Sequence, residues 1–360
     1  MKKDRANLLY IIHIDWNWIK QRPQFLAEAM EEYYDVNIVY VKPLRALFRS
    51  NNTPSNCYGI YQIPFGRVKI FRQLNDWIFR AVVHRFIAKT DIMWFTNPAQ
   101  YIKVSSIISD HIKVVYDCMD DLSEFPHNKN NINLYKRVIS DEQGLISRAD
   151  FLFFSSSQLK NTLKKRYGFT QNALILNNGI DYSILDRFIK KGFRGTTGHL
   201  YDIYYVGTIS EWFDFESLIA ILENFPVIRF VLIGPSDITI PVHERLLVQG
   251  SVEHSKLPDY LGKASALIMP FKINDLILSV NPVKLYEYIA VGCPVITCQY
   301  DEINKFHDYV YSYDTISELE LIIGNLIDGE LEVKSKESRI EFLVKNTWTE
   351  RAKLIKTELS

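Results

Sequence analysis

Short apolar runs alternate with longer amphipathic segments along nearly the whole chain, and this alternation limits the fold more than any other feature. The apolar runs cover residues 8–13, 36–41, 92–95, 114–116, 151–155, 173–176, 201–206, 230–233, 266–269 and 295–297. Strands that alternate with helical segments predict βαβ units and parallel sheets. We therefore expect an α/β fold with two doubly wound, Rossmann-like domains facing across a cleft, where ligands bind beyond the carboxyl ends of the strands.

Length and composition agree with two domains. A chain of 360 residues fits two domains of roughly 150–180 residues each. Its 47% hydrophobic and 23% charged residues exclude a disordered or low-complexity protein. An Asn-Asn-Gly turn signal at 177–179 predicts the border between the two domains near residue 178.

Several classes of protein are excluded by what the sequence lacks. The four cysteines form no CxxC pair, which predicts free thiols in a reducing cytoplasm. No apolar run reaches the roughly 18 residues of a membrane-spanning helix, and the apolar start has no signal-peptide cleavage site. The phosphate-loop, GxGxxG and HExxH motifs are missing, which argues against kinases, dehydrogenases and zinc proteases. We expect a cytoplasmic protein, or one held at the inner face of the cell membrane.

The segment 281–295 is the most informative part of the sequence. Asn281 is a good N-cap, Pro282 suits the first helical position, and Gly292 followed by Pro294 ends the helix. The segment therefore predicts a short helix with well-defined ends.

The start of this helix has the chemistry of a nucleotide site. The free amides of Val283 and Lys284 offer partial positive charge to an anion. Lys284 and Glu287 are three positions apart and share a face, so an ammonium and a carboxylate could meet a diphosphate and a ribose diol. The alternative is a capped surface helix with an ordinary ion pair.

This segment resembles the nucleotide-sugar signature of GT-B-fold glycosyltransferases, in particular the family-4-like (group 1) enzymes. Their pattern is Pro-x-Lys-x-x-Glu-Tyr-x-Ala-x-Gly-x-Pro-Val. Further short motifs follow in the family's order, at residues 22–24, 149–150, 155–157, 178–181, 205–207, 232–235 and 269–271. Within the family, the sequence is most similar to transferases of teichuronic acid and exopolysaccharide synthesis.

The resemblance implies a role for each domain. Residues 1–178 would bind the acceptor, residues 179–341 would bind a nucleotide sugar, and the helix in 342–360 would pack back on the first domain. The residues expected to bind the donor are Gly207, Thr208, Val252, Glu253, His254, Asn281, Pro282, Val283, Lys284 and Glu287. Residues 252–254 follow a short strand and could meet the base, although a lone His is more often structural. The donor would be a nucleotide-diphosphate sugar, with UDP as the expected nucleotide, and no cofactor or metal is expected.

The sequence departs from the family pattern at two places. Many members have two glutamates eight positions apart, and Glu287 matches the second, whereas Ser279 occupies the first position. The Arg and Lys that many members place after the first strand of the nucleotide domain are absent from residues 207–212. Retention and inversion of stereochemistry therefore both remain open.

Asp120 and Asp121 are the candidate catalytic residues. They follow the strand at 114–116, at the edge where catalytic groups of a parallel sheet lie. Two adjacent carboxylates raise each other's pKa, which suits a base that accepts the proton of an acceptor hydroxyl. Asp120 is the first choice. The alternative is a solvated loop acid or a helix cap, and the spacing does not match the DxD metal site of another transferase fold.

Other polar and aromatic residues after first-domain strands are candidates for binding the acceptor. They are His13, Asp15, Trp16, Trp18, Arg22 and Asn97. Aromatic faces with small polar groups suit a saccharide, but the Trp residues could equally belong to the core.

Residues 42–89 contain nine Lys or Arg and one acid, Asp76, although the whole chain is balanced at 42 of each sign. Large apolar side chains are interleaved with these cations, which predicts contact with an anionic membrane or a lipid-diphosphate acceptor. A core helix with a solvated basic face is the alternative. No nucleic-acid partner is expected, because no base-reading motif accompanies the charge.

The function expected from these features is transfer of a sugar from a nucleotide-diphosphate donor to a hydroxyl of a lipid-linked or oligosaccharide acceptor, in the synthesis of a bacterial surface polysaccharide such as a capsule. Two alternatives remain open: a nucleotide-sugar epimerase of the same fold, and a non-catalytic partner that binds a sugar nucleotide.

Overall fold

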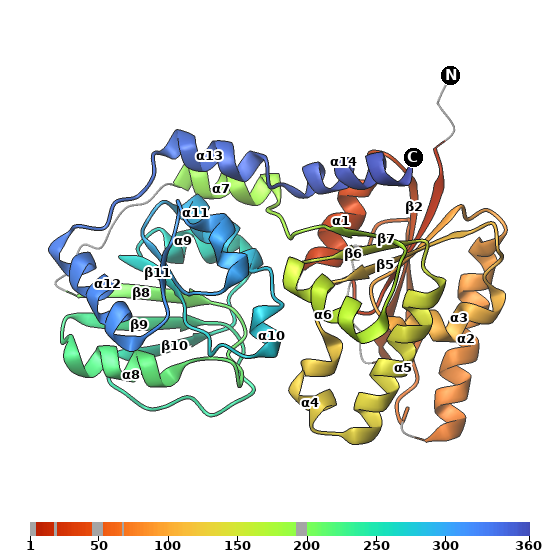
Figure 1. Ribbon diagram of the computed structural model, residues 1–360, viewed down its shortest axis with the longest axis horizontal. Coiled ribbons are helices and arrows are strands. Elements are labelled where there is room, and N and C mark those ends of the chain that lie inside the picture. Colours follow the sequence, from red (N-terminus) through yellow and green to blue (C-terminus); the bar gives the residue numbers. More distant parts are fainter. Residues whose placement is uncertain (1–4, 18–19, 45–52, 67, 192–199) are drawn as a thin grey trace. The chain divides into compact units, whose positions relative to one another are not determined.

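The computed structural model describes residues 5–17, 20–44, 53–66, 68–191 and 200–360. It divides into two compact units, the first formed by 1–177 with 348–360 and the second by 178–347. Each unit is built on a parallel sheet flanked by helices (Figure 1). The expected fold class is confirmed: both units are α/β and all strand pairs in the two sheets are parallel.

The sheet of the first unit has the strand order β3-β2-β1-β4-β5-β6-β7. Its strands are β1 (Asn7–Ile12), β2 (Asp35–Pro43), β3 (Cys57–Gln62), β4 (Ile92–Phe95), β5 (Lys113–Cys118), β6 (Phe151–Phe154) and β7 (Asn172–Ile175). Its helices are α1 (Arg22–Met30), α2 (Lys69–Ile87), α3 (Pro98–Val104), α4 (Pro126–Lys129), α5 (Ile132–Arg148), α6 (Ser157–Tyr167) and α14 (Trp348–Leu359). The order reverses between β1 and β4, so the crossovers run in opposite directions there, and the carboxyl ends of such strands are where open parallel sheets bind ligands.

The second unit repeats this plan with the order β10-β9-β8-β11-β12-β13. Its strands are β8 (Tyr201–Val206), β9 (Ile228–Ile233), β10 (Leu246–Gly250), β11 (Ala266–Met269), β12 (Val295–Cys298) and β13 (Tyr311–Tyr313). Its helices are α7 (Tyr182–Lys191), α8 (Phe215–Asn224), α9 (Leu257–Leu261), α10 (Asp275–Leu278), α11 (Val283–Val291), α12 (Ile316–Asp328) and α13 (Lys336–Val344). The reversal point lies between β8 and β11.

The central strands are apolar because both of their faces are covered. In β1, Leu8 to Ile12 are each at most 1% exposed, as expected for a parallel strand with helices on either side. Tyr10 stacks on Trp94 of β4 with ring centroids 5.6 Å apart, and Trp94 stacks on Phe153 of β6 at 5.2 Å. Stacked aromatic rings thus link three strands across the middle of the sheet.

The structure differs from the sequence expectations at the domain borders and at the sheet edges. The second unit begins at Asn178, and the first unit resumes at Trp348, so residues 342–347 belong to the second unit. Strands β3 and β13 were not predicted; both are short edge strands, and each has a single buried residue. Among the described residues, no helix is long and apolar enough to cross a membrane.

Candidate functional site

The loops after β8, β9 and β11 meet at the reversal point of the second sheet. Gly207 donates its N–H to the carbonyl of Ile233 at 2.9 Å. Ile209 donates to Pro235 at 2.9 Å, and Asp214 donates to Pro270 at 3.0 Å. Gly207 and the exposed Thr208 therefore lie at the place where open parallel sheets bind ligands.

Gly234 allows the loops to approach this closely. Its φ is +147°, and a Cβ on it would lie 1.9 Å from the carbonyl oxygen of Gly207. We expect Gly234→Ala to lower the free energy of unfolding of the second unit by about 1–3 kcal/mol, measured by urea denaturation. Gly324→Ala is the matched control, because Gly324 lies in α12 with nothing within 4 Å of its Cβ position, and alanine there stabilises the helix. Equal midpoints for the two variants would contradict the role of Gly234.

Helix α11 begins one residue later than the sequence indicates. Pro282 is its N-cap and has no capping side chain, so the prediction of Asn281 as N-cap is wrong. The buried Asn281 side chain instead accepts from the backbone N–H of Asn178 at 2.8 Å and donates to Glu302 at 3.1 Å. Its side-chain amide bonds to these two partners, so Asn281 fixes the chain just before α11.

Lys284 and Glu287 lie together on one face of α11, as the sequence predicts. Lys284 Nζ lies 3.1 Å from Glu287 Oε2, and the Glu287 side chain is only 8% exposed. The backbone N–H groups of Val283 and Lys284 bond to no other described residue. The hydroxyl of Tyr288 accepts from the N–H of Val206 at 2.7 Å, which fixes this helix against the end of β8. One helical turn thus combines two free amides, an ammonium and a sheltered carboxylate.

The remaining donor candidates lie further from the reversal point. Val252 and Glu253 follow β10, which is the edge strand of the second sheet. Glu253 is exposed and forms an ion pair with Lys256 at 3.2 Å, and His254 begins a short 3-10 turn. Their role in binding a base stays a prediction.

In the first unit, His13 marks the reversal point between β1 and β4. It directly follows β1, and its Nδ1 lies 3.0 Å from Oγ1 of Thr96, the residue after β4. Burial lowers the pKa of His13 to about 4, so the imidazole is neutral at pH 7. A neutral ring at this edge can donate or accept a hydrogen bond but supplies no charge.

Asp120 and Asp121 are adjacent in sequence but have different surroundings. The carboxylate of Asp121 is buried and accepts from both Nη atoms of Arg166 at 2.7 and 3.0 Å and from Ser123. These partners occupy the carboxylate of Asp121, and its role as the alternative base stays a prediction. The backbone carbonyl of Asp120 accepts from Sγ of Cys118 at 3.7 Å, whereas its carboxylate forms no hydrogen bond or ion pair with the described residues.

The pKa of Asp120 is raised to about 6, chiefly by burial. Arg22 acts in the opposite direction, and Asp121 and Asp117 add smaller upward contributions. The raised pKa of Asp120 is therefore predicted correctly from the sequence, but there it is attributed to the neighbouring carboxylate, which contributes less than burial does. A carboxylate with this pKa at the end of β5 is suited to accept a proton near neutral pH.

Arg22 is buried in the first unit and paired with Asp117, and its part in acceptor binding stays a prediction. Its guanidinium is 5% exposed and lies 2.6 Å from Oδ1 of the fully buried Asp117. It also donates to the carbonyl of Leu176 at 2.8 Å and lies over the ring of Trp348. These partners leave the side chain inside the fold.

The other acceptor candidates lie in the loops after β1 and β4, and two of them accept hydrogen bonds from nearby backbone N–H groups. Asp15 accepts from the N–H of Asn17 at 3.0 Å in a local turn, and Trp16 beside it is half-buried. Asn97 caps α3 by accepting from Ala99 at 3.0 Å, which accounts for its position after β4. Trp18 lies outside the described residues.

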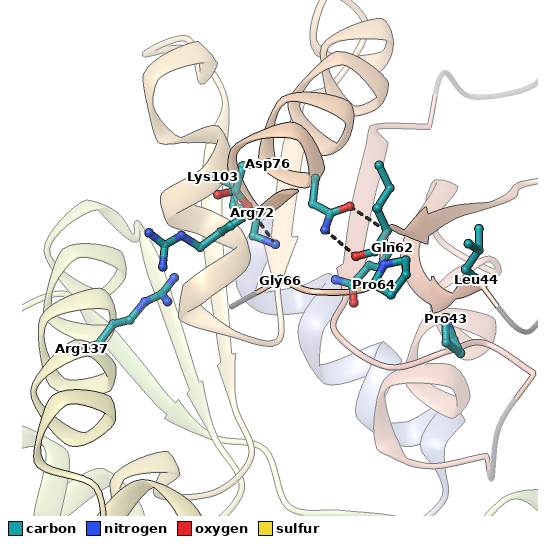
Figure 2. Close-up of a pocket in the computed structure, with 11 residues that line it drawn as sticks. Pro43, Leu44, Gln62, Pro64, Gly66, Arg72, Asp76, Lys103 and Arg137 are labelled. Carbon is teal, nitrogen blue, oxygen red and sulfur yellow. Dashed lines mark hydrogen bonds and ion pairs between the residues drawn. The ribbon is translucent and has the colours of Figure 1, made fainter. Parts of the chain in front are cut away.

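One cavity was not predicted from the sequence. It has a volume of about 770 Å³ and lies in the first unit beside the ends of β2 and β3 (Figure 2). Its charged lining residues are Arg72, Asp76, Lys103 and Arg137. They come from three helices, and only Arg72 and Asp76 belong to the basic stretch that the sequence singled out.

Comparisons with known proteins support the architecture. No family model matches the sequence. In structure, the chain is similar to sucrose-phosphate synthase from Thermosynechococcus elongatus, with a TM-score of 0.72, 13% identity and coverage of 99% of this chain and 98% of that one. It is also similar to HepE of Anabaena in complex with UDP-glucose, with a TM-score of 0.68, 12% identity and coverage of 99% of both chains. The chain has the GT-B fold.

A sequence relative agrees with this GT-B fold. A Bacillus subtilis (strain 168) protein with the provisional name teichuronic acid biosynthesis glycosyltransferase TuaH is 27% identical over 258 residues. The match covers 64% of this chain and 63% of the relative. The chain thus spans less than two thirds of the curated relative that it matches.

Proposed function

We propose that this protein is a glycosyltransferase that uses a nucleotide-diphosphate sugar, with UDP as the nucleotide. The observation that carries the proposal is the first turn of α11, where free amides, Lys284 and the sheltered Glu287 lie beside the end of β8. The GT-B fold and the name of the Bacillus subtilis relative support it. In this proposal the amides and Lys284 hold the diphosphate and stabilise the leaving group, and Glu287 binds the ribose hydroxyls.

The first unit supplies the acceptor side of the proposed reaction. Asp120 accepts the proton of the attacking hydroxyl as general base, and the neutral His13 and half-buried Trp16 offer hydrogen bonds and an aromatic face to a saccharide. All three follow strands of the same sheet at its carboxyl edge. The product would be a glycan extended by one sugar, in a surface polysaccharide such as a capsule or exopolysaccharide. No metal or cofactor takes part in this scheme.

The acceptor is proposed to be lipid-linked and to be met at the inner, anionic face of the cell membrane. Helix α2 buries Phe79, Val83 and Ile87 on one face but exposes apolar side chains on another. The exposed ones include Ile70 at 67%, Leu74 at 41% and Trp77 at 65%. Because α2 also carries Lys69, Arg72 and Arg80, this apolar face suits peripheral contact with anionic lipid.

The donor site is tested by Glu287→Ala. We expect this change to weaken UDP binding about 10–100-fold in isothermal calorimetry, because a carboxylate that bonds two hydroxyls contributes about 1.5–3 kcal/mol. Glu223→Ala is the control, since Glu223 is an exposed glutamate on α8 of the same unit. Unchanged affinity in Glu287→Ala would overturn the assignment of this helix.

A further inference from the structure

The cavity beside the ends of β2 and β3 is unusual for its charge. Arg72 forms no ion pair with a described residue, Lys103 lies 3.3 Å from Asp76, and Arg137 is 3.5 Å from Asp141. Three cations therefore face two carboxylates, one of which, Asp141, does not line the cavity. In Figure 2 the guanidinium groups of Arg72 and Arg137 extend toward one another from α2 and α5. Arg137 shares its charge with Asp141, whereas no described carboxylate pairs with Arg72.

Two hydrogen bonds fix part of the cavity wall. The side-chain amide of Asn75 accepts from the N–H of Ile63 at 2.8 Å and donates to its carbonyl at 3.0 Å. This pair of bonds holds the chain after β3 against α2. A volume of about 770 Å³ is within the range of sites that bind small molecules.

Exposed apolar side chains lie at the rim of the cavity, on the segments that follow β2 and β3. Phe65, between the lining residues Pro64 and Gly66, is 70% exposed and has a φ of +67°. Positive φ is costly for a bulky side chain, yet here it accompanies a phenyl ring turned to solvent. Leu44, which lines the cavity from the other side, is 41% exposed. An anion in the cavity could therefore carry a hydrocarbon chain that lies over Phe65 and Leu44.

We propose that this cavity binds the diphosphate of the lipid-linked acceptor, with Arg72 and Arg137 as its phosphate ligands. Guanidinium groups match phosphate oxygens with paired hydrogen bonds. The ends of β2 and β3 lie on the same edge of the sheet as His13 and Asp120, so a saccharide on the diphosphate would extend along the edge that holds the proposed base. This inference rests on the proposed function for the identity of the acceptor.

The test is flotation of the full chain with neutral phosphatidylcholine vesicles that contain a polyprenyl diphosphate or, as reference, the free polyprenol. We expect binding to the diphosphate vesicles at least 10-fold tighter than to the reference, and Arg72→Gln with Arg137→Gln to abolish this difference. Lys136→Gln with Lys164→Gln is the control, because both lysines are exposed on helices of the same unit and neither lines the cavity. UDP affinity of each variant is measured in parallel, and it should not change.

Two outcomes would overturn the inference. Equal binding to the two vesicle types excludes a diphosphate site, whatever the UDP affinity is. If inorganic pyrophosphate binds the cavity but Phe65→Ser with Leu44→Ser leaves vesicle binding unchanged, the ligand is a soluble phosphate ester and the lipid source is wrong. If the unaltered protein does not bind UDP, that result would instead contradict the proposed function.

Discussion

Asp120→Asn is expected to lower kcat for sugar transfer by about 10²–10⁴-fold, the usual contribution of a positioned general base. Asparagine keeps the shape of the side chain but cannot accept the proton of the acceptor hydroxyl. UDP affinity should stay unchanged, since Asp120 lies in the first unit and the proposed donor residues lie in the second. The measurement is steady-state transfer with calorimetry of the donor, and Asp110→Asn, an exposed acid before β5, is the control.

The pH profile gives a second readout of the same residue. Burial raises the pKa of Asp120 to about 6, so the base is ionised above pH 6 and kcat/KM should fall as the pH drops below it. For an acid with a raised pKa, the folded state binds the proton more tightly than the unfolded chain does. The ionised carboxylate therefore costs stability above pH 6, and Asp120→Asn should be at least as stable as the unaltered protein at pH 7.

Three results would contradict this role of Asp120. The first is full activity in Asp120→Asn, which a non-catalytic binding partner would also show in its own assay. The second is an activity loss accompanied by a lower melting temperature, because that combination indicates damage to the fold. The third is an acid limb that remains near pH 6 in the variant, which would assign the titration to another group.

Arg22→Met is expected to lower the free energy of unfolding of the first unit by about 3–5 kcal/mol, the cost of leaving one member of a buried ion pair without its partner. Asp117 is fully buried and accepts from Nε and Nη2 of Arg22 at 2.6–3.2 Å. Methionine keeps most of the side-chain length but removes the charge. Urea denaturation, followed by the fluorescence of the buried Trp94, measures the change.

The controls separate charge burial from packing. Lys129→Met removes an ion pair with Glu124 in which the lysine is 54% exposed, and a surface pair contributes only about 0–1 kcal/mol. Arg22→Met combined with Asp117→Leu should recover much of the lost stability, because replacing both members of a buried pair with apolar residues is often neutral. A double variant no more stable than Arg22→Met would show that the guanidinium acts through its packing on Trp348.

The sequence predicts the fold and the face of α11 because both depend on local spacing. Lys284 and Glu287 are neighbours because a helix places positions three residues apart side by side, and no contact with the rest of the chain is needed for this. Arg22 and Asp117 are far apart in sequence, so their pairing could not be read from either segment. Asp120 and Asp121 are equivalent in sequence and are distinguished by Arg166, which α6 brings from a distant part of the chain.

The same limit applies to the cavity of the first unit. Arg72, Lys103 and Arg137 belong to three different helices, and no spacing in the sequence links them. The basic stretch 42–89 was visible in the composition, but its Arg45, Arg49 and Arg67 lie outside the described residues. The part of this surface that the structure does describe depends on which face of α2 is buried, and that is decided by tertiary packing.

The first unit is discontinuous, and this affects how it can form during protein synthesis. Trp348 of α14 stacks on Phe25 of α1 with ring centroids 5.9 Å apart, and Arg351 donates to the carbonyl of Asn177 at 3.0 Å. The ribosome makes residues 348–360 only after all of the second unit. Until then the nascent first unit keeps Phe25 uncovered, so chaperones that bind exposed aromatic surface have the whole translation time of residues 178–347 in which to engage it.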